Sequence, residues 1–413
     1  MIDWLVRITL AIVLVGKTAA LGLQPDPARQ TAPVADQPPA PPGVRSLDGL
    51  LEPIRAKHKV PALAAAVVTG DGLAALGAVG VRAAGSPERV TASDLWHIGS
   101  DTKAMTAVLC AILVEQGKLE WEATLAEIFP DLAPTMHADF RAATVEQLCT
   151  NRAGFPNGLD ADGLWGRLWE HPGSPADARR LLLEGVTKHE PAARPGTKFI
   201  YSNAGFAVAG HICETVAGKP YEELIQDLLF RPLGMTTGGF GAPGTPGAID
   251  QPRGHGKNGA PRHPTADGRG ADNPPAITPA GRVHLSLEDW AKYVRVHIRG
   301  ERGEPQRIGH VTLPAAAFRR LHTPPAGDYA FGWARTERPW AGDEGNRMVL
   351  THAGSNTMWF AVAWVAPARD FAVLVCCNQA ERGDKAADEA AGAAIKDHLE
   401  HSDTGVPAPH GSR

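Results

Sequence analysis

The sequence lacks the patterns of a disulfide scaffold, a zinc site or a nucleic-acid surface. Five cysteines occur in 413 residues, an odd number, and each lies among apolar neighbours, which is typical of buried free thiols. The cysteines and the 16 histidines show no zinc-ligand spacing, and no stripe of basic and aromatic residues accompanies the net charge of −4. We therefore expect no metal, no cofactor and no nucleic-acid partner.

Long hydrophobic runs are also absent, and the apolar run at residues 8–15 is too short to span a membrane. With Arg7 before it and small residues after it, this run resembles an export signal, although Asp3 and Lys17 weaken the match. We predict a signal-like segment over residues 1–23 and a proline-rich tether over residues 24–45. The expected location is exported, periplasmic or secreted, with the membrane contacted at most through the N-terminal segment.

Hydrophobic residues make up 43% of the chain, enough for a large core. Two apolar runs flank Gly70-Asp71-Gly72 and predict a hairpin, and further strand-like runs come near the C-terminus. The predicted strands cover residues 62–68, 73–79, 329–333, 347–351, 358–366 and 371–377.

Helical patterns fill most of residues 119–226, with a capping box predicted at Thr144, and a closing helix is predicted over residues 385–399. Glycine and proline make residues 238–281 an irregular excursion. The sequence thus predicts an α+β fold in which strands from both ends of the chain form one antiparallel sheet around an inserted helical lobe. The predicted domain covers residues 46–400, with a sheet lobe (46–98 and 285–400), a helical lobe (99–284) and a tail (401–413).

A candidate catalytic pair stands at the start of an apolar series. Ser100 and Lys103 precede residues 104–114, which predict a helix that is buried all round, capped by Ser100 and ending near Gly117. Because residues three apart share a helix face, the Lys103 amine can reach the Ser100 hydroxyl. Ser-x-x-Lys arises by chance about 0.3 times in a chain of this composition, so a capped helix with a surface lysine remains an alternative.

Two further motifs follow in order. Tyr201-Ser202-Asn203 is the more informative, since Tyr-x-Asn is expected only about 0.08 times by chance, although a buried turn with a hydrogen-bonded tyrosine would also contain it. His352-Ala353-Gly354 lies on a predicted strand and gains weight only from its position and order.

Together the three motifs resemble the serine β-lactamase and penicillin-binding superfamily, nearest to class C β-lactamases, D-aminopeptidase and DD-carboxypeptidase relatives and related esterases. The likeness extends from about Ser46 to Leu399. It implies a serine β-lactamase-like fold with an antiparallel five-stranded sheet flanked by helices from both chain ends. Supporting phrases are Pro195-Gly196, Arg231-Pro232-Leu233-Gly234-Met235, Ala280-Gly281 and Gly332-Trp333.

The resemblance implies an acyl-enzyme mechanism with Ser100 as nucleophile. Lys103 would be its base, provided that the lysine pKa falls by roughly 3 from 10.4, and Tyr201 would share the proton. Asn203 would donate to the substrate amide or orient Lys103. The backbone N–H groups of Ser100 and Ser355 would form the oxyanion hole.

The third motif departs from the family pattern, because His352 replaces a lysine and Ala353 removes a hydroxyl. Substrate binding is assigned to Asn203, His352, Gly354 and Ser355, with weaker carboxylate recognition than in a dedicated β-lactamase. The predicted enzyme is a serine hydrolase that acts on an amide or ester of a small molecule or peptide: a β-lactam, a D-Ala peptide or a carboxylic ester. A non-catalytic penicillin-recognising receptor is the alternative.

Overall fold

The computed structural model describes residues 43–265 and 268–403. The predicted signal-like segment, almost all of the predicted tether and most of the predicted tail lie outside the described residues. The central element is an eight-stranded sheet of order β1-β3-β2-β15-β14-β13-β12-β11. Its strands are β1 (Arg45–Ser46), β2 (Ala62–Thr69), β3 (Gly72–Gly80), β11 (Tyr329–Ala330), β12 (Trp333–Glu337), β13 (Met348–Gly354), β14 (Phe360–Ala366) and β15 (Phe371–Cys377).

Strands from the two ends of the chain meet in the middle of this sheet. β2 and β15 pair antiparallel from Thr69 opposite Phe371 to Leu63 opposite Cys377, and nearly every residue of both strands is buried. Such strands read as continuous apolar runs because both faces of the sheet are covered. Even-numbered side chains of β2 and β15 pack on one face and odd-numbered ones on the other, as the two-residue period of a strand requires. The predicted α+β fold with a sheet closed by both chain ends is confirmed.

The predicted number of five strands is wrong, because the sheet has additional strands at both edges. Residues 329–333 were expected to form one strand, but Phe331 (φ +43°) and Gly332 (φ +91°) have left-handed backbone and turn the chain. This segment therefore folds as the short antiparallel pair β11 and β12. At the other edge β1 adds a parallel strand beside β3. The hairpin predicted around Gly70-Asp71-Gly72 joins β2 to β3.

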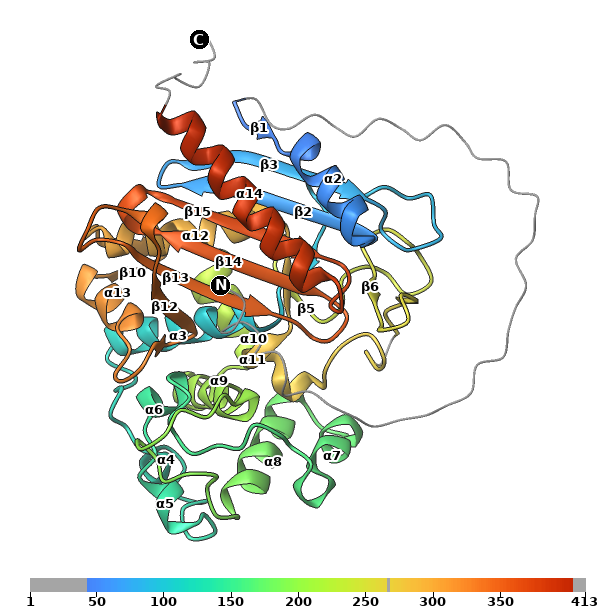
Figure 1. The fold of residues 1–413 in the computed structure, drawn as a ribbon. Helices are drawn as coiled ribbons and strands as arrows, with labels where there is room; N and C mark the ends of the chain where they lie inside the picture. Colours follow the sequence, from blue (N-terminus) through green and yellow to red (C-terminus); the bar gives the residue numbers. More distant parts are fainter. Residues whose placement is uncertain (1–42, 266–267, 404–413) are drawn as a thin grey trace.

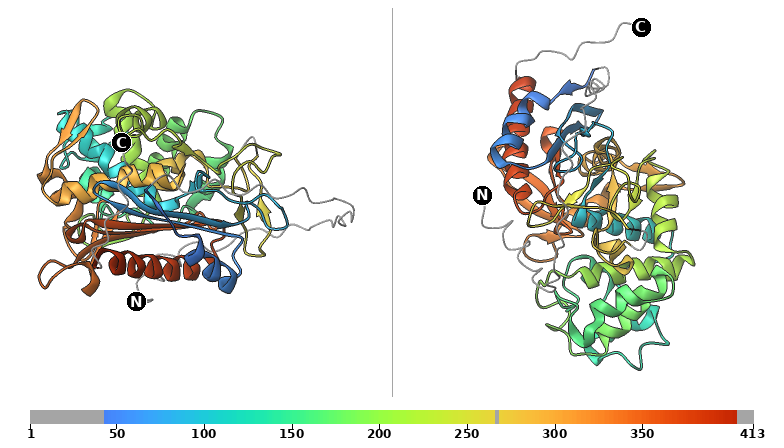
Figure 2. Two further views of the ribbon diagram at one scale, coloured as in Figure 1. Left: turned by 90° about the horizontal axis from the view of Figure 1, so that it is seen from above. Right: turned by 90° about the vertical axis from the view of Figure 1, so that its right-hand side faces the viewer.

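Helices cover both faces of the sheet. α2 (Asp48–His58) and α14 (Gly383–Asp403), which come from opposite ends of the chain, lie together on one face, as Figure 1 and the view from above in Figure 2 show. α12 (Leu287–Glu301) packs on the other face against β2, β3 and β15. The flanking helices predicted from both chain ends are thus confirmed.

Beyond α12 lies the helical lobe, green in Figure 1. Its longest helices are α3 (Thr102–Glu115), α8 (Pro175–Thr187) and α9 (Asn203–Ala217). The capping box predicted at Thr144 is present at the start of α6. The shorter helices of the chain are η1 (Gly99–Asp101), α4 (Leu125–Ile128), α5 (Ala138–Arg141), α6 (Val145–Cys149), η2 (Ala161–Gly163), α7 (Leu164–Glu170), α10 (Tyr221–Ile225), η3 (Gln226–Phe230), η4 (Pro275–Ile277), α11 (Thr278–Gly281), α13 (Ala315–His322), η5 (Pro339–Ala341) and η6 (Pro367–Arg369).

The excursion over residues 238–281 is largely irregular, as predicted, but carries short strands. β6 (Gly254–His255) and β7 (Pro261–Arg262) form a small hairpin. The remaining strands of the fold are β4 (Trp96–His97), β5 (Gly239–Phe240), β8 (Val283–Leu285), β9 (Gln306–Ile308) and β10 (Val311–Leu313).

All five cysteines are buried, as their apolar neighbours predicted. Three of them gather in the helical lobe, where Cys110 of α3, Cys149 of α6 and Cys213 of α9 meet, with 3.4 Å between the sulfurs of Cys110 and Cys213. These thiols behave as small apolar side chains that fill the space between helices. Among the described helices, none has the length and apolar character needed to cross a bilayer.

Candidate active site

Ser100 lies at the point where the sheet meets the helical lobe. It sits in η1, which continues directly into α3, and Gly99 before it has a left-handed backbone (φ +52°). α3 is buried from Thr102 to Leu113, so the prediction of a helix buried all round is confirmed. The predicted cap is wrong, because neither η1 nor α3 has a side-chain cap. The Ser100 hydroxyl is instead turned towards Lys103.

Lys103 is a buried amine with three polar neighbours. Its Nζ lies 3.0 Å from the Ser100 hydroxyl, 2.7 Å from the side-chain oxygen of Asn203 and 2.7 Å from the backbone carbonyl of Ala280. Burial lowers the pKa of Lys103 well below its usual value, against the opposing charge of Asp101. The amine is therefore poised to be neutral, as a general base must be.

The neighbours of Lys103 determine which way its lone pair points. A neutral amine has two N–H groups and one lone pair, whereas the oxygens of Asn203 and Ala280 can only accept hydrogen bonds. These two oxygens take both N–H groups. In the charged amine the third N–H donates to the Ser100 hydroxyl, whereas in the neutral amine that position holds the lone pair, to which the Ser100 hydroxyl can donate its proton. The contact of 3.0 Å is thus the geometry of a nucleophile and its base.

Tyr201 lies over this pair. Ser202 caps α9 by accepting from the Gly205 N–H, and this turn holds the Tyr201 ring centroid 4.7 Å from the Lys103 amine. The Tyr201 hydroxyl is buried and forms no hydrogen bond within the described structure. Burial raises the pKa of Tyr201, and the nearby Ser100 hydroxyl opposes that rise. Burial therefore favours the neutral phenol of Tyr201, close to the Ser100 hydroxyl.

β13 approaches η1 closely beside Ser100. A Cβ on Gly354 would overlap the Ile98 carbonyl and come within 2.7 Å of the Ser100 nitrogen, and a Cβ on Gly99 would overlap the Ser355 nitrogen. Only glycine permits this approach of β13 to η1. The backbone nitrogens of Ser100 and Ser355 therefore both lie at this contact between β13 and η1, where the resemblance places the oxyanion hole.

At His352 the structure departs from the prediction. Its ring is buried and packs against Tyr201 and Tyr329, with Nε2 3.5 Å from the Tyr329 hydroxyl. Burial lowers the pKa of His352 to about 3, which agrees with the prediction that it is neutral at pH 7. The ring stands behind Tyr201 and is not among the side chains that line the cavity described next. Side chains alternate along β13, so it is Ala353 that faces the cavity.

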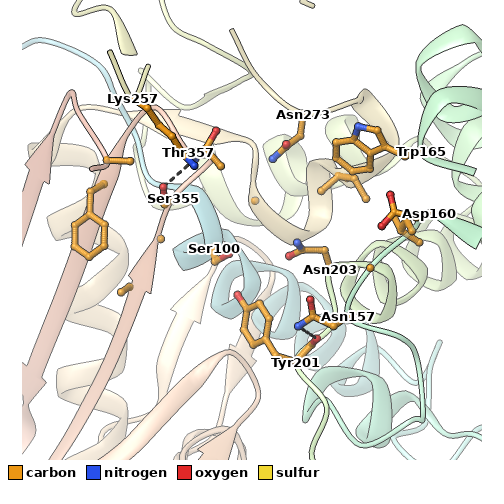
Figure 3. A pocket seen from close by; sticks show the side chains of 18 of the residues that line it. Ser100, Asn157, Asp160, Trp165, Tyr201, Asn203, Lys257, Asn273, Ser355 and Thr357 are labelled. Carbon is orange, nitrogen blue, oxygen red and sulfur yellow. Dashed lines mark hydrogen bonds between the residues drawn. The ribbon is translucent and has the colours of Figure 1, made fainter. Parts of the chain in front are cut away.

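A cavity of about 670 Å³ opens in front of Ser100. Five of the seven predicted site residues line this cavity: Ser100, Tyr201, Asn203, Gly354 and Ser355. Figure 3 labels four of them, all except Gly354. Several lining residues were not predicted, because they come from separate loops, helices and a strand end that meet only in the folded chain. They include Asn157, Asp160, Trp165, Lys257, Asn273, Ile277, Thr357, Phe360, Glu381 and Asp384.

A buried polar network supports η1 from below and was also not predicted. His97 accepts the Gly99 N–H at Nδ1 (3.1 Å), and its Nε2 lies 3.0 Å from Asp272. Asp272 also contacts Arg282, and despite burial its contacts with His97 and Arg282 hold the pKa of Asp272 at about 2. Within the described residues no group of three or more His, Cys, Asp or Glu side chains is arranged to hold a metal ion.

Comparison with known proteins agrees with this geometry. The Beta-lactamase family model matches residues 47–397, and the chain belongs to that family. The match and the fold together place the chain in the serine β-lactamase and penicillin-binding superfamily.

Two curated relatives and one solved structure illustrate the family. The chain is 25% identical over 301 residues to the unguisins hydrolase ungD' of Aspergillus campestris, covering 70% of this chain and 53% of the relative, so it spans about half of that protein's length. It is 24% identical over 330 residues to a β-lactamase of Pseudomonas fluorescens, covering 78% of this chain and 83% of the relative. The structure of the D-alanine carboxypeptidase AmpC from Burkholderia cenocepacia superposes with a TM-score of 0.62 at 21% identity, covering 82% of this chain and 95% of that one.

Proposed function

We propose that this protein hydrolyses an amide or ester through a covalent acyl-enzyme on Ser100. The observation that carries the proposal is the buried Lys103 amine, whose Nζ lies 3.0 Å from the Ser100 hydroxyl and 2.7 Å from each of two oxygens that can only accept hydrogen bonds. A serine hydroxyl is a weak nucleophile until a neutral base takes its proton. This geometry supplies that base.

The reaction begins when the Ser100 oxygen attacks the substrate carbonyl carbon and its proton passes to Lys103. The negative charge that develops on the carbonyl oxygen is stabilised by the backbone N–H groups of Ser100 and Ser355. The carbon–nitrogen or carbon–oxygen bond then breaks, and the leaving amine or alcohol takes a proton delivered through Tyr201. Water attacks the resulting ester, its proton returns through the same groups, and Ser100 is released with its hydroxyl restored.

The substrate classes that fit this chemistry are a β-lactam, a D-Ala peptide and a carboxylic ester, presented as a small molecule or a peptide. The cavity of about 670 Å³ supports a peptide-sized ligand. The relative named as a β-lactamase supports a β-lactam substrate.

The test is covalent labelling followed by turnover. A fluorophosphonate or a penicillin is expected to add its mass to Ser100 of the wild-type protein, and Ser100→Ala is expected to abolish both labelling and ester hydrolysis. Ser93→Ala, which changes an exposed serine outside the cavity, is the matched control and is expected to retain both. Unchanged ester hydrolysis in Ser100→Ala would overturn the proposal.

The same experiment separates a hydrolase from a penicillin-recognising receptor. A hydrolase releases its acyl group, so the mass of the labelled protein returns to that of the free protein as a penicillin or ester is consumed. A penicillin adduct that never clears, with no turnover of an ester, a D-Ala-D-Ala peptide or a cephalosporin, would identify a receptor instead.

We also propose that the protein is exported, on the basis of the apolar run at residues 8–15 and the small residues after it. Expression of the full chain in a bacterial host, followed by fractionation and mass measurement, tests this. A periplasmic product shortened by about the first 23 residues is expected, and a full-length cytoplasmic product would contradict it.

A further inference from the structure

The third motif does not supply the cavity with a cation, because His352 replaces the lysine of the family pattern. His352 is neutral and stands behind Tyr201, and Ala353, which does face the cavity, has no hydroxyl. A carboxylate on the substrate would therefore find no partner at that motif. Any cation that binds one has to come from another part of the chain.

Lys257 meets this requirement. Among the described residues that line the cavity it is the only lysine or arginine, and it lies on the side of Ser355 and Thr357 in Figure 3. Asp160 and Trp165 lie on the opposite side, beyond Asn203. The positive charge is thus confined to the part of the cavity that borders the end of β13.

The backbone at Lys257 is held firmly. It lies in the turn of the β6–β7 hairpin, where the Gly259 N–H donates to the Gly256 carbonyl at 2.8 Å. His255, two residues earlier, lies 2.7 Å from the Asn378 carbonyl through Nδ1 and accepts the Ala84 N–H through Nε2 at 2.9 Å. The hairpin is therefore anchored to the sheet, and its turn presents Lys257 at a fixed edge of the cavity.

The Lys257 side chain is exposed, and no carboxylate of the described residues forms an ion pair with it. Glu381 and Asp384 line the same cavity, yet neither pairs with it. An ammonium group without a protein partner keeps its three N–H donors for a ligand. A substrate carboxylate is the ligand that such a group binds through charge-assisted hydrogen bonds.

We propose that Lys257 determines substrate specificity by binding a carboxylate of the substrate, in place of the cation missing from the third motif. The inference rests on the proposed acyl-enzyme function and adds the class of substrate: an acyl compound with one free carboxylate on the Ser355 side of the scissile bond. Asp160, Glu381 and Asp384 repel additional negative charge.

The test compares two peptide esters that differ only in one group, a free carboxylate in one and its methyl amide in the other. For Lys257→Met we expect KM for the carboxylate ester to rise about 10-fold, the usual scale for losing one hydrogen bond to a charged group. The value of kcat and both constants for the methyl amide are expected to stay within about twofold. Lys396→Met, an exposed lysine on α14, is the matched control and is expected to change neither substrate.

A penicillin supplies the second arm, since it carries a carboxylate in a different scaffold. Slower acylation of Lys257→Met by penicillin alone identifies a β-lactam carboxylate as the ligand, and a rise in KM for the peptide ester alone identifies a peptide carboxylate. Equal changes for the carboxylate and methyl amide esters, or no change with any substrate, would overturn the role of Lys257 while Ser100 still labels. A wild-type protein in which Ser100 does not label and neither ester turns over overturns the proposed function itself, and the role of Lys257 with it.

Discussion

Two buried bases, Lys103 of α3 and His352 of β13, flank Tyr201, and they differ in what surrounds them. Burial lowers the pKa of both. The Lys103 amine has three oxygens within hydrogen-bond distance, one of them the Ser100 hydroxyl. The Nδ1 of His352, by contrast, has no hydrogen-bond partner in the described structure. Burial alone therefore does not create a catalytic base. The direction of the lone pair distinguishes the base from the ring that packs behind it.

Of the substitutions at these two bases, removal of the Lys103 amine is expected to have the largest effect. Lys103→Met keeps the length of the side chain but has no base, so kcat/KM for an ester is expected to fall about 10²–10⁴-fold. Steady-state ester hydrolysis measures it, with the exposed Lys118→Met as control. The same substitution also tests the stability of the fold. A lysine whose folded pKa is depressed takes up a proton on unfolding, so the free energy of unfolding rises with pH between the folded and unfolded pKa values of Lys103. Lys103→Met is therefore expected to unfold at the same or a higher temperature at pH 7, so lost activity with a lower unfolding temperature would mean a damaged fold.

A second prediction concerns the contact that brings β13 to η1. Gly354→Ala would force a Cβ into the Ile98 carbonyl, so we expect a loss of roughly 1–3 kcal/mol in the free energy of unfolding. The activity is expected to fall with it, because the Ser355 N–H moves away from Ser100. Gly392→Ala, in the interior of α14 with open space around it, is the matched control and is expected to stabilise by about 0.5–1 kcal/mol. Chemical denaturation measures both, and equal stability of the two variants would contradict the close approach.

The smallest effect is expected at His352. With a pKa of about 3, the ring stays neutral from pH 5 to 8 and titrates nowhere in that range. The acid limb of kcat/KM instead reflects Lys103, which loses its function as a base when it is protonated as the pH falls. His352→Gln is therefore expected to lower kcat/KM less than about 10-fold and to leave the acid limb where it is. Disappearance of that limb in His352→Gln would assign the titrating base to His352 rather than to Lys103.

The sequence predicts the central part of the fold because its signals are local. The apolar runs that form β2 and β15 are continuous, since both faces of these strands are buried, and the glycines between β2 and β3 mark the hairpin. The edge of the sheet could not be predicted in the same way. Whether residues 329–333 continue as one strand depends on the backbone at Phe331, a bulky residue whose positive φ has no signature in the sequence.

In the site, too, some residues are predictable from local sequence and others depend on tertiary structure. Ser100, Lys103, Tyr201 and Asn203 are found from their spacing, because each pair lies within three residues at the start of a helix, α3 for the first pair and α9 for the second. The carbonyl of Ala280, which completes the environment of Lys103, is a backbone atom that any residue would supply. Lys257 comes from an irregular loop whose place beside β13 depends on the packing of the β6–β7 hairpin. Sequence motifs therefore indicate the reacting groups, while the groups that select a substrate depend on tertiary contacts.

The burial of α3 also determines which distances in the site would stay constant if the sheet lobe and the helical lobe moved relative to each other. Ser100 and Lys103 belong to one continuous stretch of η1 and α3, so they form a single rigid body. Asn203 is carried by α9 and Ser355 follows β13, so each depends on a different neighbour of that body. A shift of one lobe against the other would change the hydration of the amine and the width of the oxyanion hole. The separation of the serine from its base would be unaffected, which makes nucleophile activation the part of the machinery least sensitive to substrate shape.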